Sequence, residues 1–212
     1  MNEKVLNAIK ELREKSKKRK FSQTFDLIIS LKELDLKKPE NKFTEDVVLP
    51  FGRGKEAEVV LFSDNVSGVD CNTMTTEDIN KLAKNKRIAK KLVSQADFFL
   101  AEAKLMPVVG KVLGQFVGPR GKMPKIISGD IKSVVKNYKK SIRIRVKDSP
   151  VIQCLVGKED MKDEEISENI GAVLNFLETK LPKGKHNIGK VLLKTTMSKP
   201  VKFEVFESGK RK

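Results

Sequence analysis

Residues on which catalysis, metal binding and disulfide scaffolds depend are scarce in this sequence. The 212 residues include one histidine, two cysteines, one tyrosine and no tryptophan. Cys71 and Cys154 lie far apart and outside any paired motif, so they are expected to be reduced, buried, small apolar residues of a cytosolic protein. His186 lies in the turn Lys185-His186-Asn187, where an exposed loop residue is expected rather than a general base. No cluster of Cys, His and Asp has metal-ligand spacing, so no metal or other cofactor is expected.

Long apolar segments and nucleotide-binding or nucleophile motifs are also lacking. No run of about 18 apolar residues occurs, which is the length that a membrane-spanning helix needs. The first 20 residues are charged throughout, unlike a secretory signal. Neither Gly-x4-Gly-Lys-Ser/Thr nor Gly-x-Ser-x-Gly is present. A cytoplasmic protein without enzymatic activity is therefore expected. An α/β enzyme acting on a phosphorylated substrate stays as an alternative, although the histidine or carboxylate cluster that it would need is missing.

Positive charge is abundant. Lysine and arginine number 44 against 28 acidic residues, which gives a net charge of +16 and a pI near 9.7. Such a balance indicates a polyanionic partner, with nucleic acid as the first choice and an anionic membrane surface as the rival. Hydrophobic residues make up 39% of the chain, enough to bury a core in one large or two small domains.

The segment from Gly52 to Ala57 has the spacing Gly-x-Gly-x-x-Ala, which occurs in dinucleotide-binding proteins. That motif requires a helix to follow, because the helix N-terminus holds the pyrophosphate. Here Val59 to Phe62 follows, which is strand-like. The glycines are therefore interpreted as a hinge between domains.

The hydrophobic pattern changes on the two sides of this hinge. Outside the segment 53–140, period-3.6 patterns predict helices over residues 3–16 and 166–177, and alternation predicts strands. These strands cover residues 25–31, 43–50, 142–147, 151–156, 191–197 and 201–206. Inside the segment, short buried strands alternate with helices that begin near Thr75, Pro107 and Ser128, the first broken near Asn85 and the last capped by Ser128.

The predicted fold class is therefore mixed, α/β and α+β, in two domains. A split α+β domain, rich in antiparallel strands, comprises residues 1–52 and 141–212. A Rossmann-like, three-layer α/β domain with a parallel sheet, residues 53–140, is inserted into it.

Two short segments combine the groups that selective RNA binding needs, namely hydroxyls, a flat apolar group and a cation. The first is Lys20-Phe21-Ser22-Gln23-Thr24, just before a strand, and the second is Thr195-Thr196-Met197-Ser198-Lys199, at a strand end. Each alone is common in ordinary proteins. Arg143, Arg145 and Lys147 share one strand face and would add a distance-tolerant positive field.

A third segment, Gly110 to Ile126, holds a short helix ended by Gly118-Pro119 and then a stiff basic loop. The loop carries Arg120, Lys122 and Lys125. Its composition alone favours a rigid connector whose cations stay solvated.

Together these segments resemble the ribosomal protein L1 family, of the archaeal type. The resemblance rests on Gly118-Pro-Arg-Gly-Lys-Met-Pro124, on Lys-Phe-x-x-Thr at 20–24 and on Thr-Thr-Met at 195–197, and it spans nearly the whole chain. It implies that the RNA-binding residues are Lys20, Phe21, Thr24, Lys158, Thr195, Thr196, Met197 and Ser198. It also implies that Arg120, Lys122 and Lys125 contact tRNA or neighbouring ribosomal components. Ser198-Lys199 departs from the Gly-Pro that is usual in the family, and a glycine there could permit close approach of RNA or a positive φ.

The function implied by the resemblance is structural. Such a protein binds large-subunit rRNA, forms the mobile stalk near the tRNA exit site and assists release of deacylated tRNA. It would also repress translation by binding its own mRNA, and it would be a monomer off the ribosome. A free-standing RNA- or DNA-binding regulator is the alternative.

Overall fold

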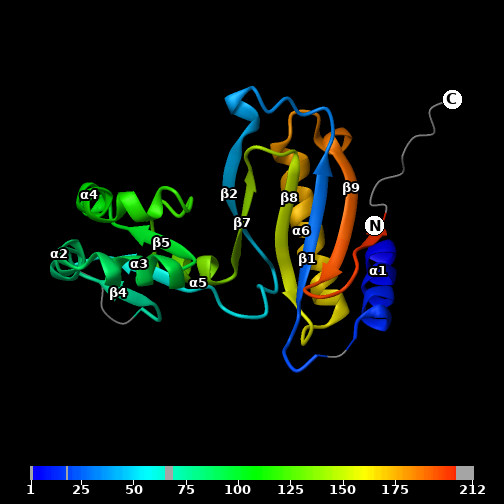
Figure 1. The fold of residues 1–212 in the computed structure, drawn as a ribbon, viewed down its shortest axis with the longest axis horizontal. Coiled ribbons are helices and arrows are strands. Elements are labelled where there is room, and N and C mark those ends of the chain that lie inside the picture. Colours follow the sequence, from blue (N-terminus) through cyan, green and yellow to red (C-terminus); the bar gives the residue numbers. More distant parts are fainter. Residues whose placement is uncertain (1, 18, 65–68, 204–212) are drawn as a thin grey trace. The chain divides into compact units, whose positions relative to one another are not determined.

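The computed structural model describes residues 2–17, 19–64 and 69–203, and the chain divides into two compact units (Figure 1). Unit 1 comprises Met1–Lys55 and Lys140–Lys212, and unit 2 comprises Glu56–Lys139. The chain therefore leaves unit 1, builds unit 2 and returns. None of the helices in the described ranges is long and apolar enough to cross a membrane.

Unit 1 is built on a four-stranded antiparallel sheet with the order β10-β9-β1-β8. Its strands are β1 (Thr24–Leu31), β8 (Val151–Lys158), β9 (Ile188–Thr195) and β10 (Val201–Phe203). β2 (Phe43–Val48) and β7 (Ser141–Val146) pair in a second, two-stranded sheet. The helices α1 (Asn2–Lys15) and α6 (Asp163–Lys180) pack on each other and on the larger sheet (Figure 1).

The period-2 pattern of β1 positions the core of unit 1. Phe25, Leu27, Ile29 and Leu31 are buried, while the residues between them face the other side of the sheet. The buried side chains pack against the apolar faces of α1 and α6, as the sequence predicts. A short 3-10 turn, η1 (Pro39–Asn41), lies between β1 and β2, and another, η2 (Gly184–Asn187), lies between α6 and β9. His186 is exposed in η2, as expected.

The end of β9 differs from the prediction. The strand stops at Thr195, so Thr196 and Met197 lie in the turn toward β10 rather than in the strand. The turn is closed by the N–H of Ser198, which donates to the carbonyl of Thr195 (3.1 Å). β10 was expected to reach residue 206, of which residues 204–206 lie outside the described part of the chain.

Unit 2 contains the expected parallel sheet, with the order β4-β3-β5-β6. The central strands β3 (Val59–Phe62) and β5 (Phe98–Ala101) are fully buried, as predicted. The edge strands β4 (Asn72–Met74) and β6 (Lys125–Ile126) were not predicted. They span three and two residues, too few for a periodic pattern to emerge.

The described part of unit 2 also contains four helices, α2 (Thr76–Lys84), α3 (Lys86–Gln95), α4 (Met106–Val117) and α5 (Ile131–Lys139). The break predicted near Asn85 is confirmed, because the Asn85 side chain accepts hydrogen bonds from the N–H groups of Arg87 and Ile88 and starts α3. The prediction that Ser128 caps α5 is wrong. The Asp130 carboxylate takes that role and accepts from the N–H groups of Lys132 and Ser133.

The glycines that precede unit 2 are held against unit 1. Gly52 and Gly54 have positive φ angles of 72° and 79°, a conformation that glycine adopts without strain. The buried Asn169 on α6 donates to the carbonyl of Gly52 (2.8 Å) and accepts from the N–H of Phe51 (3.2 Å). A Cβ at Gly54 would lie 2.9 Å from side-chain atoms of Lys158. These glycines therefore serve to fix the chain on unit 1.

Candidate nucleic-acid interface

The two hydroxyl-rich segments meet at one end of the large sheet of unit 1. β1 pairs with β9 so that Phe25 lies opposite Thr195, and with β8 so that Thr24 lies opposite Lys158. The segment before β1, the end of β8 and the turn after β9 are therefore neighbours. This juxtaposition follows from the antiparallel register, which joins the start of one strand to the ends of its partners.

Thr196 continues the β1–β9 ladder with its side chain. Its hydroxyl oxygen accepts a hydrogen bond from the N–H of Thr24 (3.0 Å) and lies 3.5 Å from the carbonyl of Thr24, to which it donates. The Thr196 side chain thus occupies the position of the next backbone group. It fixes the start of β1 and the turn after β9 relative to each other.

Two large apolar side chains are exposed at this end of the sheet. Phe21 is 51% exposed and Met197 is 60% exposed. Lys20 and Thr196 are also exposed, and Thr24 and Lys158 are half-buried. We refer to these six residues as the sheet-end surface. Exposed apolar groups among cations and hydroxyls are typical of a binding surface, because their burial becomes favourable when a partner covers them.

Gln23 is buried beneath this surface, at 1% exposure, and joins three segments. Its side-chain N–H groups donate to the hydroxyl of Ser16 (3.1 Å) and the carbonyl of Lys17 (3.3 Å), at the C-terminal end of α1. Its side-chain carbonyl accepts from the N–H of Met197 (3.3 Å). A buried amide of this kind must keep its partners, since an unsatisfied polar group costs about 1–3 kcal/mol.

Thr195 and Ser198, both predicted to bind RNA, make side-chain hydrogen bonds within the protein, and Ser198 is half-buried. Thr195 is 1% exposed, and its hydroxyl lies 3.2 Å from that of Ser16. The Ser198 hydroxyl accepts from the N–H of Thr195 (2.9 Å) and donates to the carbonyl of Lys199 (3.1 Å). Positive φ outside glycine occurs at Glu33 alone in the described residues, so Ser198 adopts an ordinary backbone conformation. Both residues support the turn that presents Thr196 and Met197.

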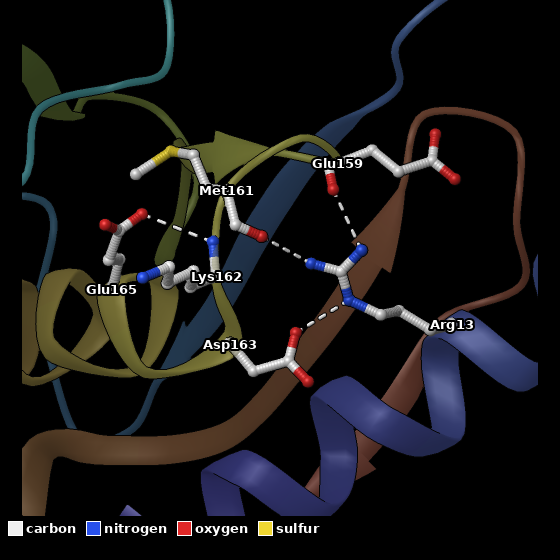
Figure 2. A network of polar contacts seen from close by, with 6 residues as sticks. All are labelled: Arg13, Glu159, Met161, Lys162, Asp163 and Glu165. Atoms are coloured by element: carbon white, nitrogen blue, oxygen red, sulfur yellow. Dashed lines mark hydrogen bonds and ion pairs between the residues drawn. The ribbon is translucent and has the colours of Figure 1, made fainter.

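Arg13 ties α1 to the turn between β8 and α6 (Figure 2). Its guanidinium donates to the Asp163 carboxylate (2.7 Å) and to the carbonyls of Glu159 (2.8 Å) and Met161 (2.7 Å). The rigid fork of an arginine suits such a set of acceptors. The turn from Glu159 to Met161 is therefore fixed on α1.

The same turn also holds the segment before β1. The Ser22 hydroxyl donates to the Asp160 carboxylate (2.5 Å), and the N–H of Gln23 donates to the Glu159 carboxylate (3.2 Å). Ser22 and Gln23, expected to present hydrogen-bonding groups to RNA, are thus used within the protein. Ser22 is nevertheless exposed, as is Phe21 before it, while Thr24 after Gln23 is half-buried.

The positive field expected from Arg143, Arg145 and Lys147 is weaker than predicted. Arg143 forms an ion pair with Asp46 across the β2–β7 ribbon (Nε–Oδ1 2.7 Å), and the Asp46 side chain is only 4% exposed. The charge of Arg143 therefore balances a buried carboxylate. Arg145 is exposed, and a cavity of about 500 Å³ lies between it, Lys147 and Gln153.

Of the three cations in the basic loop of unit 2, Lys122 has an internal role. Its ammonium donates to the carbonyls of Ala96 (2.6 Å) and Val93 (3.2 Å), at the C-terminal end of α3. A cation there satisfies free carbonyls and interacts favourably with the helix dipole. Arg120 is exposed and Lys125 is half-buried on β6.

Burial shifts the pKa values of two titratable groups in the described part of unit 1. Burial raises the pKa of Asp26 above its usual range, and the nearby Lys194 opposes the rise. Burial raises the pKa of the Cys154 thiol to about 12, with a smaller contribution from Asp26. Cys154 is buried as expected, whereas Cys71 is half-exposed, and both thiols are free. Across the described ranges, no three His, Cys, Asp or Glu residues are grouped so that they could hold a metal ion.

Residues 12–199 match the model of the Ribosomal protein L1p/L10e family. The chain is 42% identical over 209 residues to large ribosomal subunit protein uL1 of Methanothermococcus thermolithotrophicus, which covers 95% of this chain and 98% of that protein. It is 42% identical over 217 residues to the protein of the same name from Methanocaldococcus jannaschii, with 99% of each chain covered. The corresponding protein of Thermococcus kodakarensis is 40% identical over 210 residues, 95% of this chain and 97% of that protein.

Proposed function

The chain belongs to the Ribosomal protein L1p/L10e family, and on that premise we propose that it is a structural protein of the large ribosomal subunit that binds rRNA through the sheet-end surface. The family is one of structural ribosomal proteins rather than enzymes. The observation that carries the proposal is the joining of Thr24 to Thr196 by hydrogen bonds (3.0 and 3.5 Å), with Phe21 and Met197 exposed beside them.

This surface has the chemistry that RNA recognition requires. Wide, shallow minor grooves and unpaired nucleotides present 2′-hydroxyls, sugar edges and base faces. Hydroxyls of Thr24 and Thr196 can exchange hydrogen bonds with 2′-hydroxyls, and the side chains of Phe21 and Met197 can lie against sugars or bases. Lys20 and Lys158 can bind the flanking phosphates. The supporting contacts from Gln23 hold these groups before RNA arrives, which lowers the entropic cost of binding.

The finer role is proposed by family resemblance. The protein would form the mobile stalk of the large subunit in the cytoplasm and assist release of deacylated tRNA from the exit site, with Arg120 and Lys125 as cations that meet tRNA or neighbouring components. It would also repress translation by binding a site in its own mRNA that imitates the rRNA. Units 1 and 2 would be the two domains, with rRNA affinity residing in unit 1.

A competition gel shift tests the proposal. The full chain is titrated with a stalk fragment of its own large-subunit rRNA, and unrelated duplex RNA of equal length competes. We expect a preference of about a thousandfold, the lower end of what specific nucleic-acid binding shows over non-specific binding. Co-sedimentation with large subunits provides the second arm. Equal affinity for both RNAs together with no co-sedimentation would favour a free-standing nucleic-acid-binding regulator.

A further inference from the structure

A groove lies beside the sheet-end surface, between the C-terminal end of α1 and the turn from β9 to β10. Its volume is about 740 Å³, within the range of small-molecule sites. Lys15, Ser16 and Lys17 line it from α1, and Met197, Lys199 and Pro200 line it from the turn. The groove is continuous with the sheet-end surface through Met197, which belongs to both.

One side chain links the two walls of the groove by hydrogen bonds. Gln23, which also lines the groove, donates to Ser16 and to the carbonyl of Lys17 on one wall and accepts from the N–H of Met197 on the other. Because Gln23 is buried and all these bonds are made within the protein, the width of the groove is fixed in the free chain. The groove is thus a preformed cavity between two linked walls.

Charge in the groove favours a polyanion. Among the residues that the structure describes, five cations and a single carboxylate line it, and that carboxylate, Glu11, is already paired with Lys15. The remaining cations, Lys17, Arg19, Lys199 and Lys202, make no ion pair with any described residue. Four cations around one cavity attract phosphate, and the fork of Arg19 can bind two phosphate oxygens at once.

One wall also offers apolar contact. Met197 is 60% exposed, Pro200 is exposed, and Val201 lies behind them. A thioether and a proline ring present surfaces on which a flat base can rest. Bases in a duplex are stacked on their neighbours and cannot enter such a cavity, whereas an unpaired nucleotide can be turned out of the helix.

We propose that this groove takes one unpaired nucleotide of the bound RNA, with the base against Met197 and Pro200 and the adjoining phosphate at Arg19 and Lys199. The inference rests on the proposed rRNA binding and adds a site that extends beyond the two hydroxyl-rich segments to Arg19 and Pro200. The sheet-end surface would contact the helix, and the groove would take a nucleotide that leaves it. An RNA without an unpaired nucleotide at that point would lose the groove contacts and keep the others.

The test combines changes in the RNA with changes in the protein. Each unpaired nucleotide of the stalk rRNA fragment is replaced in turn by an abasic nucleotide, and the affinity of the full chain is measured across a salt series. The groove variant is Arg19→Gln/Lys199→Gln. The matched control is Lys10→Gln/Lys190→Gln, which removes two exposed cations of unit 1 that do not line the groove.

We expect one abasic position to weaken binding of the unchanged protein about tenfold, in the range that base contacts contribute. The groove variant should lower the salt slope by about one to two, and the same abasic change should then weaken its binding less than threefold. The control should show the full tenfold effect. If no abasic position distinguishes the groove variant from the control, the groove proposal is wrong while rRNA binding stands. If the unchanged protein does not prefer the rRNA fragment over unrelated duplex, the proposed function itself fails, and the groove site fails with it.

Discussion

The side-chain carbonyl of Gln23 accepts a hydrogen bond of 3.3 Å from the N–H of Met197, a residue 174 positions away. Gln23 is buried while Met197 is 60% exposed. The pair therefore links the protein interior to an exposed side chain of the sheet-end surface. Replacing Gln23 should therefore affect the sheet-end surface, although the residue itself is only 1% exposed.

The first prediction concerns Gln23→Leu, which keeps the volume and removes every hydrogen bond of the amide. The N–H of Met197 would lose its side-chain partner and the Ser16 hydroxyl would keep only Thr195 among the described residues, so the free energy of unfolding should fall by about 1–3 kcal/mol. At a temperature where the variant is still folded, its affinity for the stalk rRNA fragment should fall about tenfold or more, because the turn is no longer held. Denaturant unfolding and gel shifts measure the two effects.

Ser22→Ala is the control for that variant. Ser22 lies beside Gln23, but among the described residues its side chain hydrogen-bonds only to the exposed Asp160. Its loss should change stability by less than about 0.5 kcal/mol, as at most surface positions. If Gln23→Leu is destabilised yet binds rRNA as tightly as the unchanged protein, Gln23 supports the fold alone.

The second prediction distinguishes the shape-dependent contacts of the sheet-end surface from the general attraction that exposed cations exert on any RNA. Thr196→Ala or Met197→Ala should weaken binding to the rRNA site by about 1–3 kcal/mol, because the first removes a hydroxyl and the second an apolar side chain that bound RNA would cover. Neither change should alter the salt slope or the affinity for unrelated duplex. The double variant should lose less than the two single losses added, because Thr196 and Met197 act in one turn.

Arg145→Ala is the variant with which Thr196→Ala and Met197→Ala are compared. Arg143 does not suit this purpose, because it is paired with the buried carboxylate of Asp46 and its removal would disturb the fold. Arg145→Ala should weaken all RNAs alike and lower the salt slope by about one. Thr196→Ala behaving like Arg145→Ala on both RNAs would show that specificity lies elsewhere.

Periodic elements of this chain could be predicted from the sequence, and the contacts between segments could not. The alternation in β1 and the break at Asn85 are local features, since each depends on neighbouring residues. Thr195 and Gln23 were expected to face RNA, yet both are buried. The direction in which these two side chains point depends on α1 and on the β8–α6 turn. No local sequence pattern could reveal it, because the segments that meet here are distant from one another in sequence.

Lys122 illustrates the same limit in unit 2. Its position in a glycine- and proline-rich loop suggested a solvated cation, but it donates to the carbonyls of Val93 and Ala96, 29 and 26 positions earlier. The residues around a lysine do not indicate which distant helix end its ammonium group will contact. What the sequence does predict is the loop itself, because Gly118-Pro119 ends α4 where expected.

The third prediction uses the buried thiol of Cys154 as a probe of unit 1. Burial raises its pKa from an ordinary value of 9.0 to about 12, so the native thiol should resist alkylation at pH 8, where the thiolate is the reactive form. Cys71, which is half-exposed, should react first. Mass spectrometry after timed iodoacetamide treatment would identify the labelled residue, and rapid labelling of Cys154 in the native protein would contradict its burial.

The same shift predicts how stability depends on pH. The folded protein holds the Cys154 proton more tightly than the unfolded chain does, so the stabilisation is complete below pH 9 and is lost as the pH rises from 9 toward 12. Denaturant unfolding of the unchanged protein should therefore show a steeper decline above pH 9 than unfolding of Cys154→Ala. Parallel pH profiles for the two proteins would rule out this contribution.

The last prediction distinguishes the cations of the basic loop in unit 2. Arg120→Gln/Lys125→Gln should leave the affinity for the rRNA fragment unchanged within about twofold, because both residues belong to unit 2 while the sheet-end surface belongs to unit 1. Lys122→Met should also leave that affinity unchanged, but it should destabilise unit 2 by about 1–3 kcal/mol, since the carbonyls of Val93 and Ala96 lose a charged donor. Calorimetry should then show an earlier transition for Lys122→Met alone, while slow alkylation of Cys154 confirms that unit 1 stays folded. A large fall in rRNA affinity for Arg120→Gln/Lys125→Gln, with Cys154 still protected, would place rRNA contacts in unit 2 and overturn the assignment of these cations to tRNA or neighbouring components.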